Sequence, residues 1–391
     1  MIGRVRLRRA ALAALIGLAP TLPAIAAPVK LSVETDYRLG YDINPFLTAG
    51  DNLASAYVQT SIAPKLSKRT EKGEMALSGH FDRTAYLDKY GKSDQYGGQF
   101  ELQQRVTPKL NMFAALRYDS DVIGQGDDDV TGIPIDDIDV NLIGTRRRSD
   151  TYAASGGFQY QATPRDTISV DGGYTATRYG NGPGGGDSDT MGGRVAWQRA
   201  INARTKVGIS GSVYRIDYDT PGISTLIMEP RVTFSTELSA TWHVDASLGV
   251  SFSDLSLPPP MADRRTKGLS GSVNLCHKGT RDDFCFFAAR SVSASGVGGS
   301  VESTQLGMNY NRKITERLDV VAGGSYARSE TQSGLFPTRE YVSAHGGLNW
   351  HVTRQITVGT EGRYRDVFGG GPIKGDLGGE IFAIVALPGT R

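Results

Sequence analysis

Apolar and polar residues alternate with a period of two along most of this chain. The stretch that starts at Lys30 shows the pattern clearly. One set of positions reads Leu31, Val33, Thr35, Tyr37, Leu39 and Tyr41, and the set between them reads Lys30, Ser32, Glu34, Asp36 and Arg38. A period of two places these sets on opposite faces of a β-strand. Strands usually run for about 5–6 residues, whereas a tilted strand that crosses a membrane needs about 9–11. The length of the run therefore favours a membrane strand.

The same alternation recurs at 226–235, 242–253 and 356–365. Pro230 interrupts the first of these stretches. Proline has no backbone N–H to donate to a sheet, so we expect a bulge or another irregularity at this point.

Short turns separate the alternating stretches, and several of them resemble one another, such as Thr163-Pro164-Arg165 and Asn202-Ala203-Arg204. They recur at spacings near 38 residues, from 163 to 202, from 202 to 239 and from 315 to 353. The gap from 239 to 315 is twice as long, and a turn from His277 to Asp282 fills it. A repeat of this kind indicates an array of β-hairpins.

The turns and loops give a strand count. Short turns fall near 65–72, 107, 163, 202, 239, 279, 315 and 353, and longer connections fall at 42–52, 86–94, 120–150, 180–188, 219–224, 255–266, 295–302, 331–339 and 368–374. Eight turns and nine loops predict an all-β, transmembrane, antiparallel up-and-down barrel of 18 strands. Sixteen is the alternative, because the stretches near 73–85 and 283–294 are weaker. The short turns should be periplasmic and the long loops extracellular.

Residues 1–26 have the features of a signal peptide, and the barrel is expected to span 27–391. Four arginines precede an apolar stretch from Ala10 to Leu18, and Ala24-Ile25-Ala26 fits a small-residue cleavage site. The leader predicts export, and with the strand pattern it predicts the outer membrane of a Gram-negative cell. The rest of the chain has no run of 18 apolar residues, which excludes a helical membrane span.

Composition agrees with a barrel and excludes some partners. The net charge is +2 and basic residues are scattered, so nucleic acid is not an expected partner. The mean hydropathy of −0.28 fits a barrel because half of each strand faces a wet lumen.

No motif of a hydrolase, nucleotide-binding protein or metalloenzyme is present, so we expect no enzymatic activity, no cofactor and no metal. His80 and Asp82 share a strand face and could imitate a hydrolase dyad. Two lumen-facing polar residues are the favoured interpretation, and an outer-membrane hydrolase is kept as an alternative.

Alternation also predicts which charged side chains face the lumen. The acids are Glu34, Asp36, Glu101, Asp119, Asp171, Glu229, Asp245 and Glu361, and the bases are Arg38, Arg105, Arg117, Arg194, Arg231, Arg363 and Arg365. Many of them can simply pair across the wall. The near balance of signs argues against strong ion selectivity and fits a neutral or weakly charged polar solute such as a sugar chain.

Cys276 and Cys285 flank the turn at 277–284 at equal offsets from its centre. Directly opposed residues of paired strands have Cβ atoms about 4.5–5.5 Å apart, close to what a disulfide tolerates. We therefore predict a disulfide in the oxidising periplasm, with two free thiols as the alternative.

The longest loop, 120–150, is acidic first and ends in Arg146, Arg147 and Arg148. A loop of this length is usually functional or disordered. It could constrict the pore, bind divalent cations and lipopolysaccharide outside, or remain a solvated loop.

Several motifs resemble a known family. Tyr41-Asp42-Ile43-Asn44-Pro45-Phe46 resembles the start of an outer-membrane β-barrel porin family of alphaproteobacteria, Ser67-Lys68-Arg69-Thr70-Glu71 resembles its first turn, and Asp171-Gly172-Gly173-Tyr174 resembles its repeated strand pattern. The spacing Asp376-x-Gly378-x-x-Ile381-x-Ala383 resembles the closing-strand signal that the barrel-assembly machinery reads, although Pro388 to Arg391 follow it.

The family resemblance implies a barrel and suggests a link to exopolysaccharide, because such members often accompany exopolysaccharide or exosortase-type gene clusters. By analogy with alginate-export barrels, we expect a channel for exopolysaccharide export, with periplasmic export partners and with lipid and lipopolysaccharide around it. A general or sugar-uptake porin and a non-conducting structural or adhesive barrel are the alternatives. The family supplies no catalytic residues.

Overall fold

The computed structural model describes residues 29–123, 140–180, 186–220, 222–297, 299–332, 337–369, 371 and 373–390. The predicted signal peptide and the acidic half of the longest loop lie outside these residues. The described part contains eighteen strands and one 3₁₀ turn, η1 (Val140–Leu142), and no helix in it is long and apolar enough to cross a membrane.

The strand bounds follow the predicted pattern of turns and loops closely. They are β1 (Val29–Asp42), β2 (Ser55–Thr70), β3 (Gly73–Tyr86), β4 (Lys92–Thr107), β5 (Leu110–Val122), β6 (Arg148–Gln161), β7 (Asp166–Tyr179), β8 (Ser188–Ala200), β9 (Thr205–Tyr218), β10 (Ser224–Glu237), β11 (Trp242–Ser256), β12 (Arg264–Lys278), β13 (Asp282–Ala294), β14 (Ser300–Lys313), β15 (Leu318–Thr331), β16 (Arg339–His351), β17 (Ile356–Phe368) and β18 (Asp376–Thr390).

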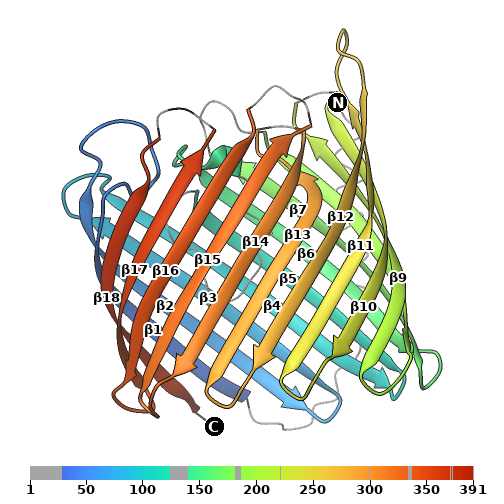
Figure 1. Cartoon of the computed structure of the whole chain (residues 1–391), viewed down its shortest axis with the longest axis horizontal. Coiled ribbons are helices and arrows are strands. Elements are labelled where there is room, and N and C mark those ends of the chain that lie inside the picture. The colour runs from blue at the N-terminus through green and yellow to red at the C-terminus, as the bar shows by residue number, and fades with distance from the viewer. Residues whose placement is uncertain are drawn as a thin grey trace.

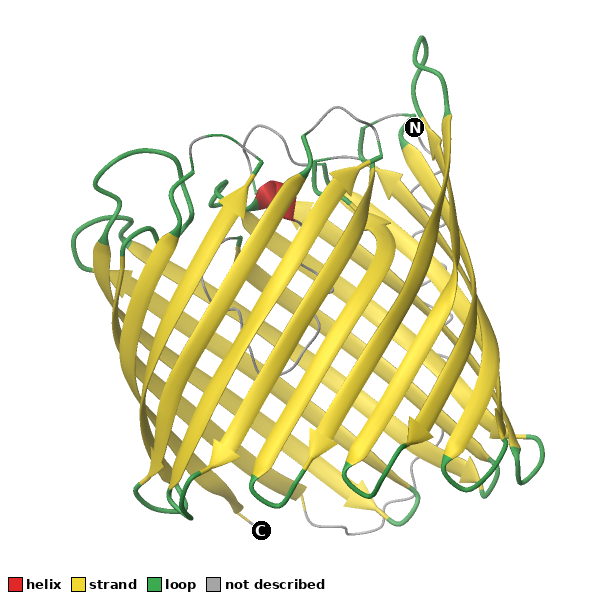
Figure 2. Cartoon of the chain, in the orientation of Figure 1, coloured by secondary structure: helices red, strands yellow, loops and turns green. Residues whose placement is uncertain are grey.

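The sheet closes on itself. Each strand pairs antiparallel with its neighbours in the sequence, and β18 pairs with β1 from Asp42↔Gly378 to Leu31↔Thr390. Short turns gather at one end of the barrel and longer loops at the other (Figures 1 and 2). The prediction of a closed, antiparallel, 18-stranded barrel is confirmed, and both weak stretches are strands. The first turn is shorter than predicted, because β2 continues to Thr70.

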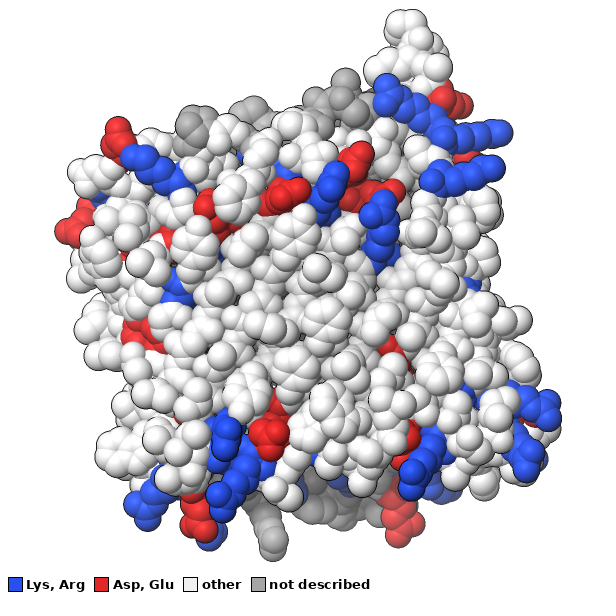
Figure 3. Space-filling model, viewed as in Figure 1, with Lys and Arg blue, Asp and Glu red and all other residues white. Residues whose placement is uncertain are grey.

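The outer surface carries a broad apolar band. Side chains that point outward include Leu39, Leu77, Leu116, Val195, Leu248 and Leu269, each between 49% and 66% exposed. Charged side chains gather toward the two ends of the strands on the face seen in Figure 3. Because no water is present in a bilayer core, a closed barrel with such a band is one of the few folds that can span it.

Aromatic side chains form a row on the outer face near the loop end. The ring centroids of Tyr96 and Tyr118 are 6.1 Å apart, and those of Tyr118 and Tyr152 are 4.8 Å apart. Tyrosine favours the membrane–water boundary because its ring is apolar and its hydroxyl is polar. The row therefore marks one edge of the apolar band.

Proline interrupts the hydrogen-bond ladder at two places. The β10–β11 register passes from Met228↔Phe252 to Arg231↔Gly249 and omits Glu229 and Pro230, which fits the irregularity expected at Pro230. The β2–β3 register passes from Ile62↔Phe81 to Lys65↔Ser78 and omits Pro64 in the same way. Both strands still pair on their other side, so each proline weakens one edge only.

Candidate functional site: the lumen wall and its mouth

The charged residues that alternation predicted for the lumen all lie on the inner face of the barrel. On β1, for example, Asp36 and Arg38 alternate with the outward-facing Tyr37 and Leu39, which are 53% and 49% exposed. The other strands place Glu34, Glu101, Arg105, Arg117, Asp119, Asp171, Arg194, Glu229, Arg231, Asp245, Glu361, Arg363 and Arg365 by the same rule.

Several of these residues pair with a neighbour two positions away on the same strand. Arg231 Nη2 lies 2.8 Å from Glu229 Oε2, and Arg38 Nε lies 2.6 Å from Asp36 Oδ2. Arg117 pairs with Asp119 in the same way, and His243 Nε2 lies 2.6 Å from Asp245 Oδ2. Within the described residues, Glu34, Glu101, Arg105, Asp171 and Arg194 form no ion pair.

A larger group of charges lies where the ends of the chain meet. We call it the closing-seam cluster, and it comprises Asp36, Arg38, Asp42, Tyr57, Arg363, Arg365, Asp376 and Glu380 on β1, β2, β17 and β18. Three arginines face four acids in it.

The contacts of the cluster cross strand boundaries. Arg38 Nη1 lies 2.7 Å from Glu380 Oε1, and Arg363 Nη2 lies 2.6 Å from Asp42 Oδ2. The Tyr57 hydroxyl donates to Glu380 Oε2 at 2.5 Å. These groups are largely buried, so their mutual attraction is screened less than that of a surface pair. The cluster therefore ties β18 to both β1 and β2.

The sequence prediction found only part of this cluster. Asp42, Tyr57, Asp376 and Glu380 were not in the predicted lumen set. Their signal was available, since Asp376, Gly378 and Glu380 follow the period of two in the closing strand. The contact of Tyr57 with Glu380 depends on closure of the barrel, which a single strand does not encode.

Residues 44–47 of the first long loop fold into the barrel rather than away from it. Phe46 is 0% exposed and Leu47 is 1% exposed. The Asn44 backbone N–H donates to Asp376 Oδ1 at 2.8 Å, and Arg365 Nη2 donates to the Pro45 carbonyl oxygen at 2.9 Å. The closing-seam cluster thus also anchors this loop inside the mouth.

A second segment crosses the mouth. Residues 140–147 connect to β6, yet η1 contacts β15 and β16 on another side of the barrel. Arg339 Nη1 donates to the carbonyl oxygens of Asn141 at 3.1 Å and Ile143 at 3.2 Å. Apolar side chains complete the junction in a buried cluster of Leu47, Val140, Ile143, Ala327, Tyr341 and Val367.

The two inward segments also touch each other. The Arg146 guanidinium lies 4.6 Å from the centroid of the Phe46 ring and 5.2 Å from that of Tyr90. Burial raises the pKa of the Tyr90 hydroxyl, which donates to the Leu53 carbonyl oxygen at 2.7 Å. The described residues of the longest loop therefore lie inside the mouth, as expected if the loop constricts the pore. The acids Asp127, Asp128, Asp129, Asp136, Asp137 and Asp139, which the cation alternative requires, lie outside the described residues.

Cys276 and Cys285 are directly opposed on β12 and β13, and a disulfide joins them. The bond lies on the inner face near the turn end. Among the described residues, no group of three histidine, cysteine or acidic side chains could hold a metal ion.

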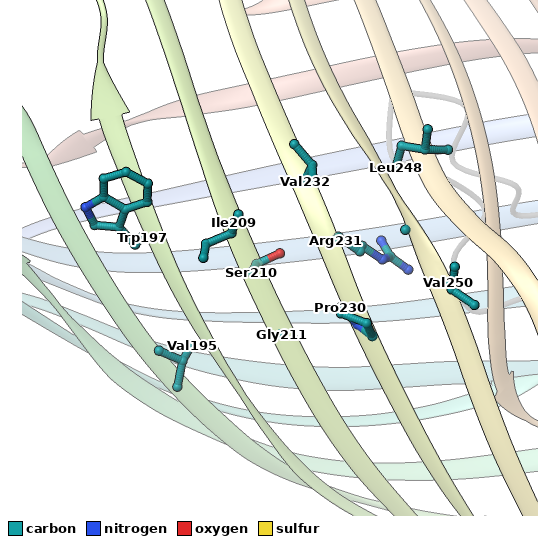
Figure 4. Close-up of a pocket in the computed structure, with 11 residues that line it drawn as sticks. Val195, Trp197, Ile209, Ser210, Gly211, Pro230, Arg231, Val232, Leu248 and Val250 are labelled. Atoms are coloured by element: carbon teal, nitrogen blue, oxygen red, sulfur yellow. The ribbon is translucent and has the colours of Figure 1, made fainter.

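A shallow hollow of about 580 Å³ marks the outer wall of β8–β11 (Figure 4). Trp197, Ile209, Val232 and Leu248 surround it, and Pro230 lies at its floor beside the interrupted ladder. Its lining is almost entirely apolar. It lies in the apolar band, and Ser210 and Arg231, the polar residues of its lining, belong to the inner face of β9 and β10.

No protein-family model matches the chain, and no curated protein matches it in sequence. Solved structures of outer-membrane porins do superpose on it. OccK2 (OpdF) from Pseudomonas aeruginosa superposes with a TM-score of 0.50 over 92% of this chain and 98% of that one, at 8% identity. A BenF-like porin from Pseudomonas fluorescens gives 0.48 over 93% and 99%, at 10% identity. At 8% identity, the likeness to OccK2 establishes the fold, a closed β-barrel, and nothing about cargo.

Proposed function

We propose that this chain is an outer-membrane channel for polar solutes, with its loop end outside the cell. The observation that carries the proposal is the combination of a closed barrel, an apolar outer band and a polar inner wall. A wall of this kind spans a bilayer and offers water and polar solutes a hydrated path. Porin structures with the same fold agree with this function.

Two segments of the chain narrow the channel at its mouth. Residues 43–48 and 140–147 are held inside it by buried apolar contacts and by Arg339. A path that passes these segments should favour small solutes, with selection by size and by the arginine–acid pairs along the wall.

Removal of Arg339 tests this arrangement. We expect Arg339→Ala to raise single-channel conductance in planar bilayers, because residues 140–143 lose the donor that holds three of their carbonyl oxygens. The matched control is Arg328→Ala, which removes an arginine from the outer face of β15 and should leave conductance unchanged. Equal conductance of both variants and the wild type would rule out the constriction.

Export of exopolysaccharide is the second candidate. The near balance of acids and bases on the inner wall favours it, since such a wall suits a neutral sugar chain. A polymer would require residues 43–48 and 140–147 to move.

Deletion of the gene should then lower the mass of secreted polysaccharide, whereas an unchanged mass together with slower uptake of a small sugar would favour the uptake porin. OccK2 has been solved with glucuronate, so glucuronate and a neutral hexose make a suitable pair of test solutes.

Export and location remain predictions that simple experiments address. The mature protein should begin at Ala27, which N-terminal sequencing of the outer-membrane fraction would show. Lipopolysaccharide, the barrel-assembly machinery and periplasmic export partners are the proteins and lipids with which we expect it to associate.

A further inference from the structure

The hydrogen-bond ladder between two neighbouring strands, β12 and β13, ends halfway along their length. The β12–β13 ladder runs from Lys278↔Asp283 to Gly271↔Arg290 and stops there. Neither strand ends at this point. β12 continues to Arg264 while paired with β11, and β13 continues to Ala294 while paired with β14. Toward the loop end, the wall therefore has two separate edges where one ladder would be expected.

The β13 edge is tucked inside the barrel, beneath β9–β12. Val292 and Ala294 would face outward by alternation, yet they pack against Ile216 and Ile227 on the inner face of β9 and β10. On β14, which belongs to the same hairpin, the Glu302 carboxylate lies against the inner side of Gly268 on β12, where an added Cβ would approach its Oε2 to 3.1 Å. We call residues 291–297 and 299 the tucked edge.

Hydrogen bonds hold the tucked edge in place. The backbone of Val292 lies beside the Glu229 carboxylate on β10. The backbone N–H of Ser295 donates to the Tyr218 hydroxyl at 3.1 Å, and that hydroxyl donates to the Gly299 carbonyl oxygen. Tyr218 thus replaces part of the ladder that β13 does not form with β12.

The tip of the tucked edge reaches the segment that crosses the mouth. A Cβ added at Gly296 would come within 2.3 Å of Leu142 Cδ1 and 2.6 Å of the Tyr179 hydroxyl. The Gly296 carbonyl oxygen also accepts a hydrogen bond from the Gly186 N–H at 2.7 Å. A side chain here would have to displace Leu142 or Tyr179. The position of the tucked edge and that of residues 140–147 are therefore coupled by direct contact.

This arrangement leaves polar groups without partners. The edge of β12 from Arg265 to Ser270 forms no ladder with β13. Beneath the tucked edge, the hydroxyls of Thr225, Ser253 and Ser270 are 1–2% exposed and have no hydrogen-bond partner among the described residues. Unmade hydrogen bonds are costly at a barrel wall and in a buried layer. They raise the free energy of the arrangement seen here, which brings it close to that of an arrangement in which these bonds form.

We propose that the tucked edge is a gate with two positions: the tucked one seen here, and one in which β13 zips to β12 by continuing the existing register. The next inward-facing pairs would be Ser270↔Ser291 and Gly268↔Ser293. Zipping removes the overlap, which enlarges the perimeter of the barrel at its loop end, and it withdraws Gly296 from Leu142. The zipped position is the more open channel. This inference rests on the proposed channel function and adds its regulation.

A cysteine pair tests the zipped position. In a Cys276→Ala, Cys285→Ala background, Gly268→Cys and Ser293→Cys would be directly opposed only after zipping. They would lie on the same face and in the same class of ladder pair as the native Cys276 and Cys285. We expect an intrachain cross-link on mild oxidation, and a larger unit conductance of the cross-linked channel than of the same channel after reduction. The single-cysteine variants are the controls.

The hydrogen bonds of the Tyr218 hydroxyl, which we call the latch, give a second, independent readout. Tyr218→Phe removes the hydroxyl that binds Ser295 and Gly299, and should raise the zipped population about tenfold, the factor that two ordinary hydrogen bonds represent. It should appear as longer open times and faster cross-linking. Tyr214→Phe removes a hydroxyl from the same face of β9 without touching Ser295 or Gly299 and should change neither.

The outcomes separate the gate from the channel. Absence of any conductance in the wild type would overturn the channel and the gate together. Normal conductance with no cross-link, or with a cross-link that leaves conductance unchanged, would overturn the gate and leave the channel intact. Equal behaviour of Tyr218→Phe and Tyr214→Phe would likewise contradict the latch.

Discussion

Two seams of this barrel differ in a way that chain connectivity does not suggest. At the closing seam, β18 and β1 come from opposite ends of the chain, yet they pair along nearly their whole length with one register shift. At the second seam, β12 and β13 are joined by a short turn and a disulfide, yet they separate above Gly271 and Arg290.

The difference lies in the side chains that cross each seam. Arg38 reaches Glu380 across β1 and β18, and Arg363 reaches Asp42. In the first two inward pairs that β12 and β13 would form beyond the end of their ladder, every residue is serine or glycine, namely Ser270, Gly268, Ser291 and Ser293. Small side chains cannot bridge two strands or hold them in register, so this seam is free to part. Side-chain bridges, rather than proximity in sequence, decide where the wall is continuous.

The largest expected effect comes from breaking the closing seam. Arg363→Ala leaves Asp42 and Glu380 without a shared cation in a site where the Arg363 side chain is only 17% exposed. We expect a loss of about 3 kcal/mol in the free energy of unfolding, in the range found when one partner of a buried ion pair is removed. Urea unfolding followed by tryptophan fluorescence measures it.

The control for this change is Arg105→Ala, which removes an exposed inner-wall arginine that forms no ion pair in the described part of the chain. It should cost less than about 0.5 kcal/mol. Equal losses for the two variants would show that the ion pairs of Arg363 add no stability beyond that of an unpaired arginine on the inner wall.

The disulfide is the next test, because it braces the paired half of the second seam. Cys276→Ser with Cys285→Ser should lower the free energy of unfolding by about 2–3 kcal/mol, the value for a short closed loop. The same variant should increase hydrogen exchange at Phe286 and Leu275, which flank the bond. Thiol titration of the unreduced wild type should find no reactive thiol, and two would mean that the bond does not form.

Pro230 offers a smaller test of what a broken ladder costs. Pro230→Val restores a backbone N–H on the β11 side, where the register omits two residues. A recovered hydrogen bond contributes about 1 kcal/mol, and the loss of proline's restriction of the unfolded chain offsets part of it. We expect a net gain of about 0.5 kcal/mol by the same urea measurement. Pro64→Val should behave alike, and a loss at both sites would show that the prolines relieve strain.

The smallest effect concerns an exposed tie between the loops at the closing seam. The hydrogen bond from Lys374 lowers the pKa of Asp51. Because this pKa is lowered, the stabilisation from the Asp51–Lys374 pair is fully present above the ordinary aspartate pKa. It is lost as the pH falls through the lowered value. In Lys374→Ala the Asp51 pKa should rise toward normal, as measured by carboxyl carbon shifts in labelled protein. An unchanged value would mean that the two side chains do not meet in solution.

Much of the fold was predictable because one face of every strand must be apolar and the other polar. That rule gave the strands, the turns, the count of eighteen and the inward position of residues such as Arg363 and Glu229. It could not give Tyr57 with Glu380, since their contact arises only when β18 meets the first hairpin. It also could not show that Phe46 and Leu47 turn inward, because a loop has no period, or that β13 leaves β12, because both keep their alternation throughout.

Planar-bilayer recording of the purified wild-type protein tests the central claim most directly. A polar lumen restricted by residues 43–48 and 140–147 predicts discrete conductance steps that grow when Arg339 is replaced by alanine and stay unchanged when Arg328 is. Complete absence of conductance steps from folded, inserted protein, in the wild type and in Arg339→Ala alike, would contradict a channel and favour the non-conducting barrel.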